Sequence, residues 1–495
     1  MSLAIVHSRA QIGVEAPAVT VEVHMANGLP SLTLVGLPET AVKESKDRVR
    51  SAILNSALQY PSRRITLNLA PADLPKDGGR FDLAIALGIL AASVQVPTLT
   101  LDNVECLGEL ALSGEVRAVK GVLPAALAAR KAGRTLIVPR ANAEEACLAS
   151  GLKVIAADHL LQVVAHLNGH VPIEPFVSSG LMYLNKPYPD LSEVQGQLAA
   201  KRALLIAAAG AHNLLLSGPP GTGKTLLASR LPGLLPPLSE QEALEVAAIQ
   251  SVVSLAPLSH WPHRPFRQPH HSASGPALVG GGSKPQPGEI TLAHHGVLFL
   301  DEFDRKVLEV LREPLESGHI VIARARDRVS FPARFQLVAA MNPCPCGYVG
   351  EPSGRCRCTP EQIQRYRNKL SGPLLDRIDL HVTVARESTA LNPAKQSGDD
   401  TASASVLVAE ARERQQRRQG CANAFLDLPG LRQHCKLAKA DEGWLESACE
   451  RLTLSLRAAH RLLKVARTLA DLEQVDAIAR HHLAEALQYR PAATG

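Results

Sequence analysis

Residues 214–226 read Leu-Leu-Leu-Ser-Gly-Pro-Pro-Gly-Thr-Gly-Lys-Thr-Leu, an apolar strand that runs into a glycine-rich loop and then into a helix. Glycines in such a loop let backbone N–H groups surround phosphate oxygens at a helix N-terminus. Lys224 is expected to reach those oxygens, and the Thr225 hydroxyl to bind Mg²⁺. The stretch therefore predicts a nucleotide-phosphate site made of Gly218, Pro219, Pro220, Gly221, Thr222, Gly223, Lys224 and Thr225.

A second motif supports hydrolysis of the nucleotide. Residues 296–300 read Gly-Val-Leu-Phe-Leu, the continuous apolar run of a buried parallel strand, and end in Asp301 and Glu302. Asp301 is expected to join Thr225 around Mg²⁺, and Glu302 to polarise the attacking water. The alternative is an ordinary strand end with a solvated acidic pair.

The composition is that of a globular protein with several domains. The chain has 495 residues, of which 46% are hydrophobic and 20% charged, and about three domains are expected at this length. No apolar run approaches the roughly 20 residues of a membrane span, so a cytoplasmic protein without membrane contacts is expected. Aromatic residues make up only 3%, so binding of nucleic acid is expected to rely on backbone contacts.

The pattern divides the chain into four parts. Residues 1–175 predict an α+β domain, residues 176–190 a linker, residues 191–386 the βα units of a doubly wound parallel sheet in the α/β class, and residues 387–495 helices. The clearest expected elements are strands at 19–24, 31–35 and 64–69 and helices at 81–92, 123–131, 406–419, 441–470 and 475–489.

Three further polar side chains follow apolar or helical patterns in this part of the chain. A buried strand over residues 335–341 ends in the amide of Asn342, at the place expected for the γ-phosphate or its attacking water. Arg377 follows a tight apolar turn, and Arg457 lies at the start of a helix that Ser455 is expected to cap.

Together these residues resemble the AAA+ ATPases of the helix-2-insert group, and most closely the magnesium-chelatase-like ComM/YifB family. The most specific stretches are residues 266–274, 279–283 and 341–347. The resemblance implies that Asn342 is sensor 1, Arg377 the arginine finger and Arg457 sensor 2. It also implies that the helices of residues 387–495 form a C-terminal lid. Because an arginine finger acts on the neighbour's nucleotide, it also implies a homo-hexameric ring with ATP between subunits. The alternative for Arg377 is a local ion pair with Asp376 or Asp379.

One segment departs from the family pattern. Family members carry the form Asp-Glu-Leu-Pro-Glu-Phe, whereas Glu302 is followed directly by Phe303 and Asp304. The carboxylates are retained, and the start of the next helix is expected to be reshaped.

Two insertions of this group project toward the ring channel, and both are present. One is a glycine-rich tip at residues 280–287 that carries Lys284, and the other is a predicted hairpin at residues 319–330. The hairpin places Arg324, Arg326 and Arg328 at period two, a row suited to a DNA backbone without sequence readout. The alternative is a solvated face whose arginines pair with Asp327 or Glu316. The basic helix at 411–420 is equally open to a solvated role or to nucleic-acid binding.

Four of the nine cysteines lie in one Gly/Pro-rich loop: Cys344, Cys346, Cys356 and Cys358. Soft thiolates in a cytosolic chain favour a structural Zn²⁺ ion over disulfides. The C-x-C spacing is tighter than the usual C-x-x-C, so the predicted site is strained. The histidine pairs at 270–271 and 294–295 are expected to serve packing rather than metal binding.

The N-terminal region resembles the Lon-protease-type domain of the ribosomal-S5-like fold, with its marker at residues 75–82. The positions of a Lon nucleophile and base hold Arg80 and Leu123, so proteolysis is not expected. Arg80 is expected to serve subunit contacts or DNA, or else to pair with Asp77 or Asp82.

The resemblance implies a Mg²⁺-dependent ATPase that translocates on single-stranded and branched DNA. It further implies a branch migration helicase that promotes integration of incoming single-stranded DNA in natural transformation, with a recombinase and other recombination proteins as partners. A metal-chelatase-type motor subunit and a protein-remodelling ATPase are the alternatives.

Overall fold

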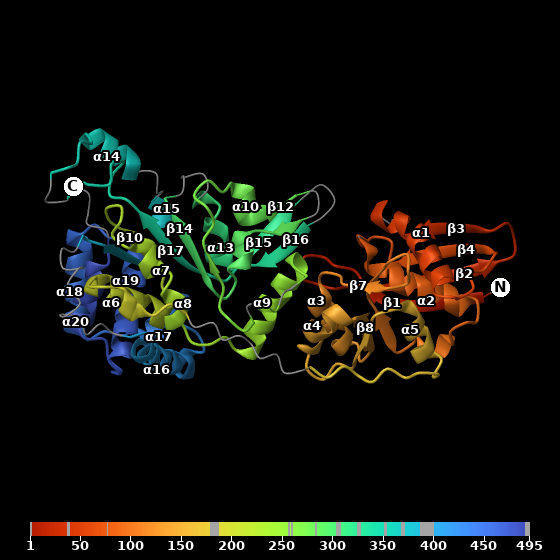
Figure 1. Ribbon diagram of the computed structural model, residues 1–495. Helices are drawn as coiled ribbons and strands as arrows, with labels where there is room; N and C mark the ends of the chain where they lie inside the picture. Colours follow the sequence, from red (N-terminus) through yellow and green to blue (C-terminus); the bar gives the residue numbers. More distant parts are fainter. Residues whose placement is uncertain are drawn as a thin grey trace. The chain divides into compact units, whose positions relative to one another are not determined.

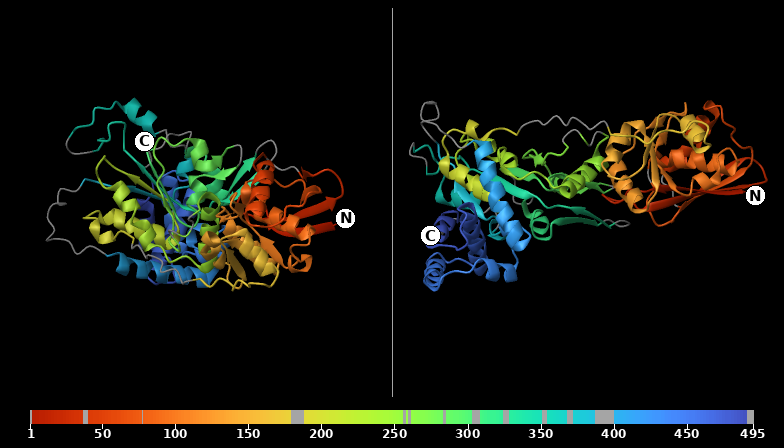
Figure 2. Two further views of the ribbon diagram at one scale, coloured as in Figure 1. Left: turned by 45° about the vertical axis from the view of Figure 1, so that its right-hand side comes forward. Right: turned by 90° about the horizontal axis from the view of Figure 1, so that it is seen from below.

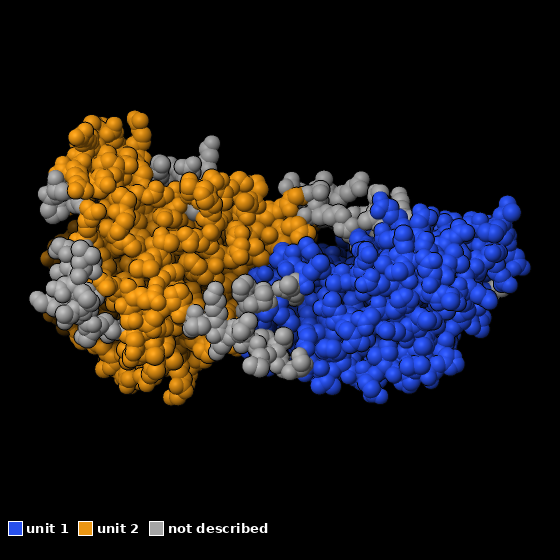
Figure 3. All heavy atoms as spheres, viewed as in Figure 1, with its two compact units in different colours: residues 1–184, 240–262 blue, residues 185–239, 263–495 orange. Residues whose placement is uncertain are grey.

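Figure 1 shows a computed structural model of the protein. The structure describes all residues except 1, 37–39, 77, 179–187, 256–257, 259–260, 283–284, 303–307, 324–327, 351–353, 368–371, 387–399 and 491–495. The chain forms two compact units, coloured separately in Figure 3. Unit 1 contains residues 1–184 and 240–262, and unit 2 contains residues 185–239 and 263–495. The inclusion of residues 240–262 in unit 1 is a feature that the sequence patterns did not predict.

Unit 1 is built on a seven-stranded mixed sheet in the order β3-β4-β2-β1-β5-β8-β9. Strands β1, β2 and β4 pair in antiparallel fashion, and the remaining neighbours are parallel. The three strands expected in this region are confirmed. The strands of unit 1 are β1 (Ser2–Arg9), β2 (Ala18–Ala26), β3 (Ser31–Val35), β4 (Arg64–Ala70), β5 (Val104–Cys106), β6 (Glu109–Leu110), β7 (Val116–Arg117), β8 (Thr135–Pro139) and β9 (Val154–Ala157).

One helix forms the centre of unit 1. Every residue of α2 (Asp82–Ala92) is buried, which is why its sequence is apolar on all sides. It packs against β1 and β2, and at Gly88 an added Cβ would lie 2.5 Å from Cγ2 of Val23. The other helices of unit 1 are α1 (Thr40–Asn55), α3 (Val122–Lys131), α4 (Ala143–Cys147), α5 (Leu160–Leu167) and α9 (Glu240–Val253).

Helix α9 follows the phosphate-loop motif in the sequence, yet it belongs to unit 1 and packs on α3. Ala247 and Ala248 bury against Leu123, and Ser251 closes the contact with polar bonds. The carbonyl of Ser251 accepts from the Gly121 N–H at 2.8 Å, and the Ser251 hydroxyl donates to the buried carboxylate of Glu145. Apolar packing and satisfied polar groups thus make α9 an integral part of unit 1.

Unit 2 contains a five-stranded, fully parallel sheet in the order β11-β14-β17-β10-β18. The predicted α/β class is confirmed. The apolar runs of the central strands are buried, as expected for a parallel sheet covered on both faces. The strands are β10 (Leu214–Ser217), β11 (Phe266–Arg267), β14 (Val297–Asp301), β17 (Gln336–Met341) and β18 (Leu380–Thr383).

Short elements surround this sheet. Two hairpins, β12 (Gly280–Gly281) with β13 (Gln286–Pro287) and β15 (His319–Ala323) with β16 (Arg328–Pro332), correspond to the two expected insertions. The helices are α6 (Leu198–Gly210), α7 (Lys224–Ala228), α8 (Leu231–Leu234), α10 (Gly275–Val279), α11 (Glu289–Leu292), α13 (Arg312–Ser317), α14 (Pro360–Arg367) and α15 (Gly372–Leu375).

The C-terminal part of unit 2 is helical, as expected, and packs through α16 and α19 against α6 (Figure 2). The helical pattern expected over 441–470 is interrupted, because Thr453 adopts φ of 49° and the Ser455 side chain caps a new helix by accepting from Ala458 N–H. The helices are α16 (Thr401–Gln419), α17 (Leu428–His434), α18 (Lys439–Arg451), α19 (Leu456–Leu472) and α20 (Arg480–Gln488). Among the described residues, none of the helices has the length and apolar character needed to span a membrane.

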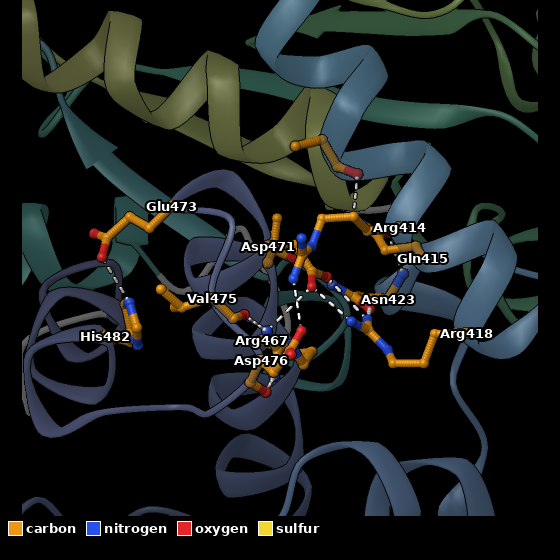
Figure 4. A network of polar contacts seen from close by, with 12 residues as sticks. Arg414, Gln415, Arg418, Asn423, Arg467, Asp471, Glu473, Val475, Asp476 and His482 are labelled. Atoms are coloured by element: carbon orange, nitrogen blue, oxygen red, sulfur yellow. Dashed lines mark hydrogen bonds and ion pairs between the residues drawn. The ribbon is translucent and has the colours of Figure 1, made fainter.

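A buried polar network joins α16 and α19 (Figure 4). The fully buried carboxylate of Asp471 accepts from Arg418 at 2.6 and 2.9 Å, from Arg467 at 3.1 Å and from Asn423 at 2.8 Å. Arg414 pairs with Asp476 at 2.6 Å. Arg414 and Arg418 of the basic helix at 411–420 are thus engaged in intramolecular ion pairs.

Candidate nucleotide site

The phosphate loop lies between the carboxyl end of β10 and the start of α7. Gly221 and Gly223 adopt φ of 77° and 85°, a region open mainly to glycine. At Gly218 an added Cβ would lie 2.2 Å from the carbonyl oxygen of Val384, so the loop passes close to the end of β18. The glycines therefore let the loop curl tightly above the sheet.

Lys224 is buried and turned onto its own loop. Its Nζ donates to the carbonyls of Gly218 at 2.8 Å and Pro219 at 2.9 Å, and to Oδ1 of Asn342 at 3.1 Å. Burial lowers the pKa of Lys224, although Asp301 and Glu302 oppose that shift. An ammonium group held by neutral oxygens in a partly desolvated loop is well suited to an anionic partner.

The carboxylates lie at the carboxyl end of β14, next to the loop. The Thr225 hydroxyl lies 3.5 Å from Oδ2 of Asp301, which places together the two oxygens expected to bind Mg²⁺. Glu302 adopts φ of 55°, an uncommon conformation for a residue with a side chain, and its N–H donates to Ala340 O at 3.1 Å. This bend turns Glu302 toward Asn342, whose Nδ2 donates to its carboxylate.

Three segments thus converge at the carboxyl edge of the sheet: the phosphate loop, the end of β14 and the end of β17. Lys224, Asn342 and Glu302 form one hydrogen-bonded chain, and Thr225 and Asp301 lie beside it. Backbone N–H groups in a glycine loop, a buried lysine and a hydroxyl–carboxylate pair fit Mg-ATP in donor type. Ligands of open α/β sheets bind at this edge.

Tyr366 of α14 is an additional residue of this surrounding that the sequence patterns did not reveal. Burial raises its pKa, and the charge of Glu302 acts in the same direction. The sequence of α14 does not indicate that Tyr366 lies near the carboxylates, because the position of this helix depends on the loop that precedes it.

The structure does not bring Arg377 and Arg457 to the phosphate loop of the same chain. Arg377 precedes β18, and its carbonyl accepts from Asn213 Nδ2 at 3.1 Å, just before β10. Since β10 and β18 are parallel, with Leu214 opposite Leu380, Arg377 lies at the amino edge of the sheet, opposite to Lys224.

Both arginines instead meet Glu316 at the end of α13. Arg377, whose side chain is buried, donates to Oε1 of Glu316, and Arg457 donates to the same oxygen at 2.6 Å. The hydrogen bond from Arg457 leads the effects that lower the pKa of Glu316. Asp379, considered as a local partner of Arg377, is engaged by Arg461 at 2.9 Å. Glu316, one of the two partners considered for the hairpin arginines, is thus engaged by Arg377 and Arg457.

Of the expected DNA-binding residues, Lys284, Arg324 and Arg326 lie outside the described residues, as do Phe303 and Asp304 of the altered segment. Arg328 is exposed on β16, opposite Ala323. The alternation of the hairpin is confirmed: Ile320, Ile322, Val329 and Phe331 are buried while the intervening side chains are exposed.

Other expected positions are found as follows. Nδ1 of His294 accepts from the Arg334 N–H at 3.0 Å, a packing role. In unit 1, Arg80 donates to Gln11 at 3.0 Å and to the Gly121 carbonyl at 3.4 Å. Asp82 pairs with Arg48 at 2.8 Å, and Asp77 lies outside the described residues. Leu123, at the other Lon position, is buried beneath α9.

The fold and the site define an AAA+-type ATPase of the magnesium-chelatase-like class. Three family models match the chain: "Magnesium chelatase, subunit ChlI" over residues 190–391, "Subunit ChlI of Mg-chelatase" over residues 21–142, and "Magnesium chelatase, subunit ChlI C-terminal" over residues 398–490.

Curated relatives narrow the family. The competence protein ComM of Haemophilus influenzae is 54% identical over 99% of this chain and 98% of its own length. The uncharacterized protein YifB of Escherichia coli K12 is 54% identical over 99% of this chain and 97% of its own. The magnesium-chelatase 38 kDa subunit of Rhodobacter capsulatus is 26% identical over 60% of this chain and 85% of its own length. The chain therefore belongs to the ComM/YifB family of magnesium-chelatase-like proteins.

Proposed function

We propose that the protein is a ring-forming, Mg²⁺-dependent ATPase that moves along DNA, and that it acts as a branch migration helicase. The observation that carries the ATPase part is the hydrogen-bonded chain of Lys224, Asn342 and Glu302 beside the Thr225–Asp301 pair. The DNA part rests on similarity to the relative named competence protein ComM.

In this proposal Lys224 leaves the carbonyls of Gly218 and Pro219 and donates to the phosphates of ATP. Thr225 and Asp301 would hold Mg²⁺, which would supply positive charge next to the phosphates of ATP. Glu302 accepts a proton from the attacking water, and Asn342 fixes the position of that water. The bent backbone at Glu302, with φ of 55°, turns its carboxylate toward Asn342.

Two arginines complete the proposed site from a neighbouring subunit. Arg377 and Arg457 lie together at the amino edge of the sheet, away from Lys224, which is compatible with action on the nucleotide of the next subunit. A homo-hexamer with ATP at each interface would satisfy this arrangement.

The proposed DNA contacts are Lys284, Arg324, Arg326 and Arg328 of the two insertions. Guanidinium groups bind phosphate without reading bases, so single-stranded and branched DNA would be bound independently of sequence. A role in natural transformation and recombination, with a recombinase among the partners, extends the proposal. The proposal places the protein in the cytoplasm.

The test compares the wild-type chain with Lys224→Ala and Glu302→Gln in two assays: ATP hydrolysis, and movement of a labelled four-way DNA junction at low salt. We expect the wild-type chain to hydrolyse ATP and to move the junction, and both variants to do neither. Glu302→Gln is expected to retain binding of ATP. Hydrolysis without binding or movement of DNA would refute the helicase. ATP hydrolysis stimulated by a porphyrin or by an unfolded polypeptide, in place of DNA, would indicate the chelatase-type motor or the remodelling ATPase.

A further inference from the structure

The loop between β17 and α14 brings four cysteines together. The Sγ atom of Cys344 lies 3.4 Å from that of Cys346 and 3.8 Å from that of Cys356, and the latter two are 3.6 Å apart. Cys358 completes the group, with all four sulfur atoms within 4.8 Å of one another. All four are free thiols, so the cluster is not a pair of disulfides.

We propose that these four cysteines bind one Zn²⁺ ion that holds the sensor Asn342 and the phosphate loop in place. A Zn–S distance of about 2.3 Å in a tetrahedron gives sulfur atoms about 3.8 Å apart. The separations of 3.4, 3.6 and 3.8 Å are close to that value. An all-sulfur set favours zinc or iron over Mg²⁺ and Ca²⁺. Binding converts the thiols to thiolates and releases their protons to solvent.

The surrounding backbone supports a thiolate. The N–H of Val349 donates to Sγ of Cys344 at 3.4 Å, and the N–H of Gly347 donates to the Cys344 carbonyl at 2.9 Å. Cys344 is buried, so its sulfur is protected from solvent. Hydrogen bonds of this kind orient metal ligands and stabilise their charge.

The same loop contacts the nucleotide site. Cys344 follows Asn342 by two residues. Gly347 adopts φ of 85°, and an added Cβ would lie 2.6 Å from Cδ of Pro220 and 3.8 Å from Cγ of Asn342. Gly347, next to the last residue of the Cys344–Cys346 turn, is therefore packed directly on the phosphate loop.

A metal ion that closes this turn would restrict the backbone on the carboxyl side of Asn342 and the position of Pro220. The cysteines are then positioning residues and take no part in the reaction itself. This second step rests on the proposed ATPase function, whereas binding of the ion does not.

Metal analysis of the purified full-length chain tests the site. We expect one zinc per chain, and after exchange with Co²⁺ the absorption bands of tetrahedral thiolate coordination. Cys358→Ser is expected to lower zinc affinity at least tenfold. Cys449→Ser, at a partly exposed cysteine of α18 outside the cluster, is the matched control and should retain full occupancy. A chain without zinc that also fails to take up Co²⁺, or one that contains iron, would overturn the proposal.

The effect on the nucleotide site is tested on wild-type protein stripped of metal by a chelator and then resupplied with Zn²⁺. We expect about a tenfold lower kcat without zinc, a smaller change in KM for ATP, and recovery on addition. Unchanged kinetics at zero occupancy would exclude the positioning role. If the zinc-loaded chain hydrolyses no ATP, the proposed function fails, while zinc stoichiometry and the Co²⁺ spectrum still decide whether the site exists.

Discussion

Nζ of Lys224 lies 3.1 Å from Oδ1 of Asn342, which joins two residues 118 positions apart in the sequence. Because Nδ2 of the same amide donates to Glu302, Asn342 connects the cation of the phosphate loop to the carboxylate that would activate water. The amide satisfies both neighbours only in one orientation, with its oxygen toward the lysine and its nitrogen toward the glutamate.

Asn342→Ala is expected to lower kcat for ATP hydrolysis by about 10²-fold with little change in nucleotide affinity, because the water and Glu302 lose their alignment while the phosphate loop remains. Steady-state ATP hydrolysis and binding of a fluorescent nucleotide separate the two effects. Gln336→Ala, at the other end of β17, controls for damage to the strand. Equal losses of affinity and kcat would contradict the assigned role.

Glu316→Gln is expected to raise ATP hydrolysis of the assembled ring about two- to fivefold. Glu316 pairs with both Arg377 and Arg457. The pair with Arg457 is half exposed and contributes on the order of 0–1 kcal/mol, so loss of the charge releases Arg457 at modest cost, and it also removes one charged partner of the buried Arg377. Glu313→Gln, one turn earlier on α13, is the matched control. A fall in activity would mean that Glu316 holds the arginines in their active position.

The contribution of Glu316 to stability should depend on pH. Because its pKa is lowered in the folded chain, chiefly by Arg457, the contribution is present above the ordinary glutamate value of about 4.3 and disappears as the pH falls through the lowered value. The difference in unfolding between wild type and Glu316→Gln, measured by urea titration, should be constant from pH 8 to about pH 5 and vanish in stronger acid. A difference that grows in acid would contradict this account.

Subunits that lack Arg377 should be rescued by subunits that lack Lys224. Arg377→Ala and Lys224→Ala are each expected to lower ATP hydrolysis at least 10³-fold when assembled alone. A mixed ring contains some interfaces with an intact lysine on one side and an intact arginine on the other, since these residues lie at opposite edges of the sheet. Hydrolysis should therefore recover partly on mixing, as measured by phosphate release. Absence of recovery would argue for a structural role of the Arg377–Glu316 pair.

Asp471→Asn is expected to destabilise unit 2 by about 3–5 kcal/mol, because Arg467 stays buried without its countercharge. Thermal unfolding and urea titration measure the loss. Asp476→Asn, at a carboxylate that is fully exposed, is the matched control and should change little. Similar behaviour of the two variants would show that the network of Figure 4 contributes little net stability.

The nucleotide site was predictable from the sequence because its geometry is local. A strand, a glycine loop and a helix occur in order around Lys224, and the apolar run before Asp301 predicts both a buried strand and the edge at which it ends. Parallel pairing then brings the two ends together without further information.

The contacts of Glu316 were not predictable in the same way. Its partners lie 61 and 141 positions along the chain, and a glutamate at the end of a short helix has many possible neighbours. The same holds for α9, because the sequence patterns assigned neither this helix nor the surface that covers it. Residues 324–327, on which the arginine row largely depends, lie outside the described residues.

The excursion of residues 240–262 into unit 1 has a practical meaning. The backbone passes from one unit to the other three times, near residues 184, 239 and 262. The two units are therefore connected by three segments of the chain and not by a single linker. Deletion of residues 1–184 would strip α9 of its apolar cover and expose Ala247, Ala248 and Ser251 to water. The N-terminal region therefore supplies the cover of a helix that lies, along the sequence, between the phosphate loop and β11.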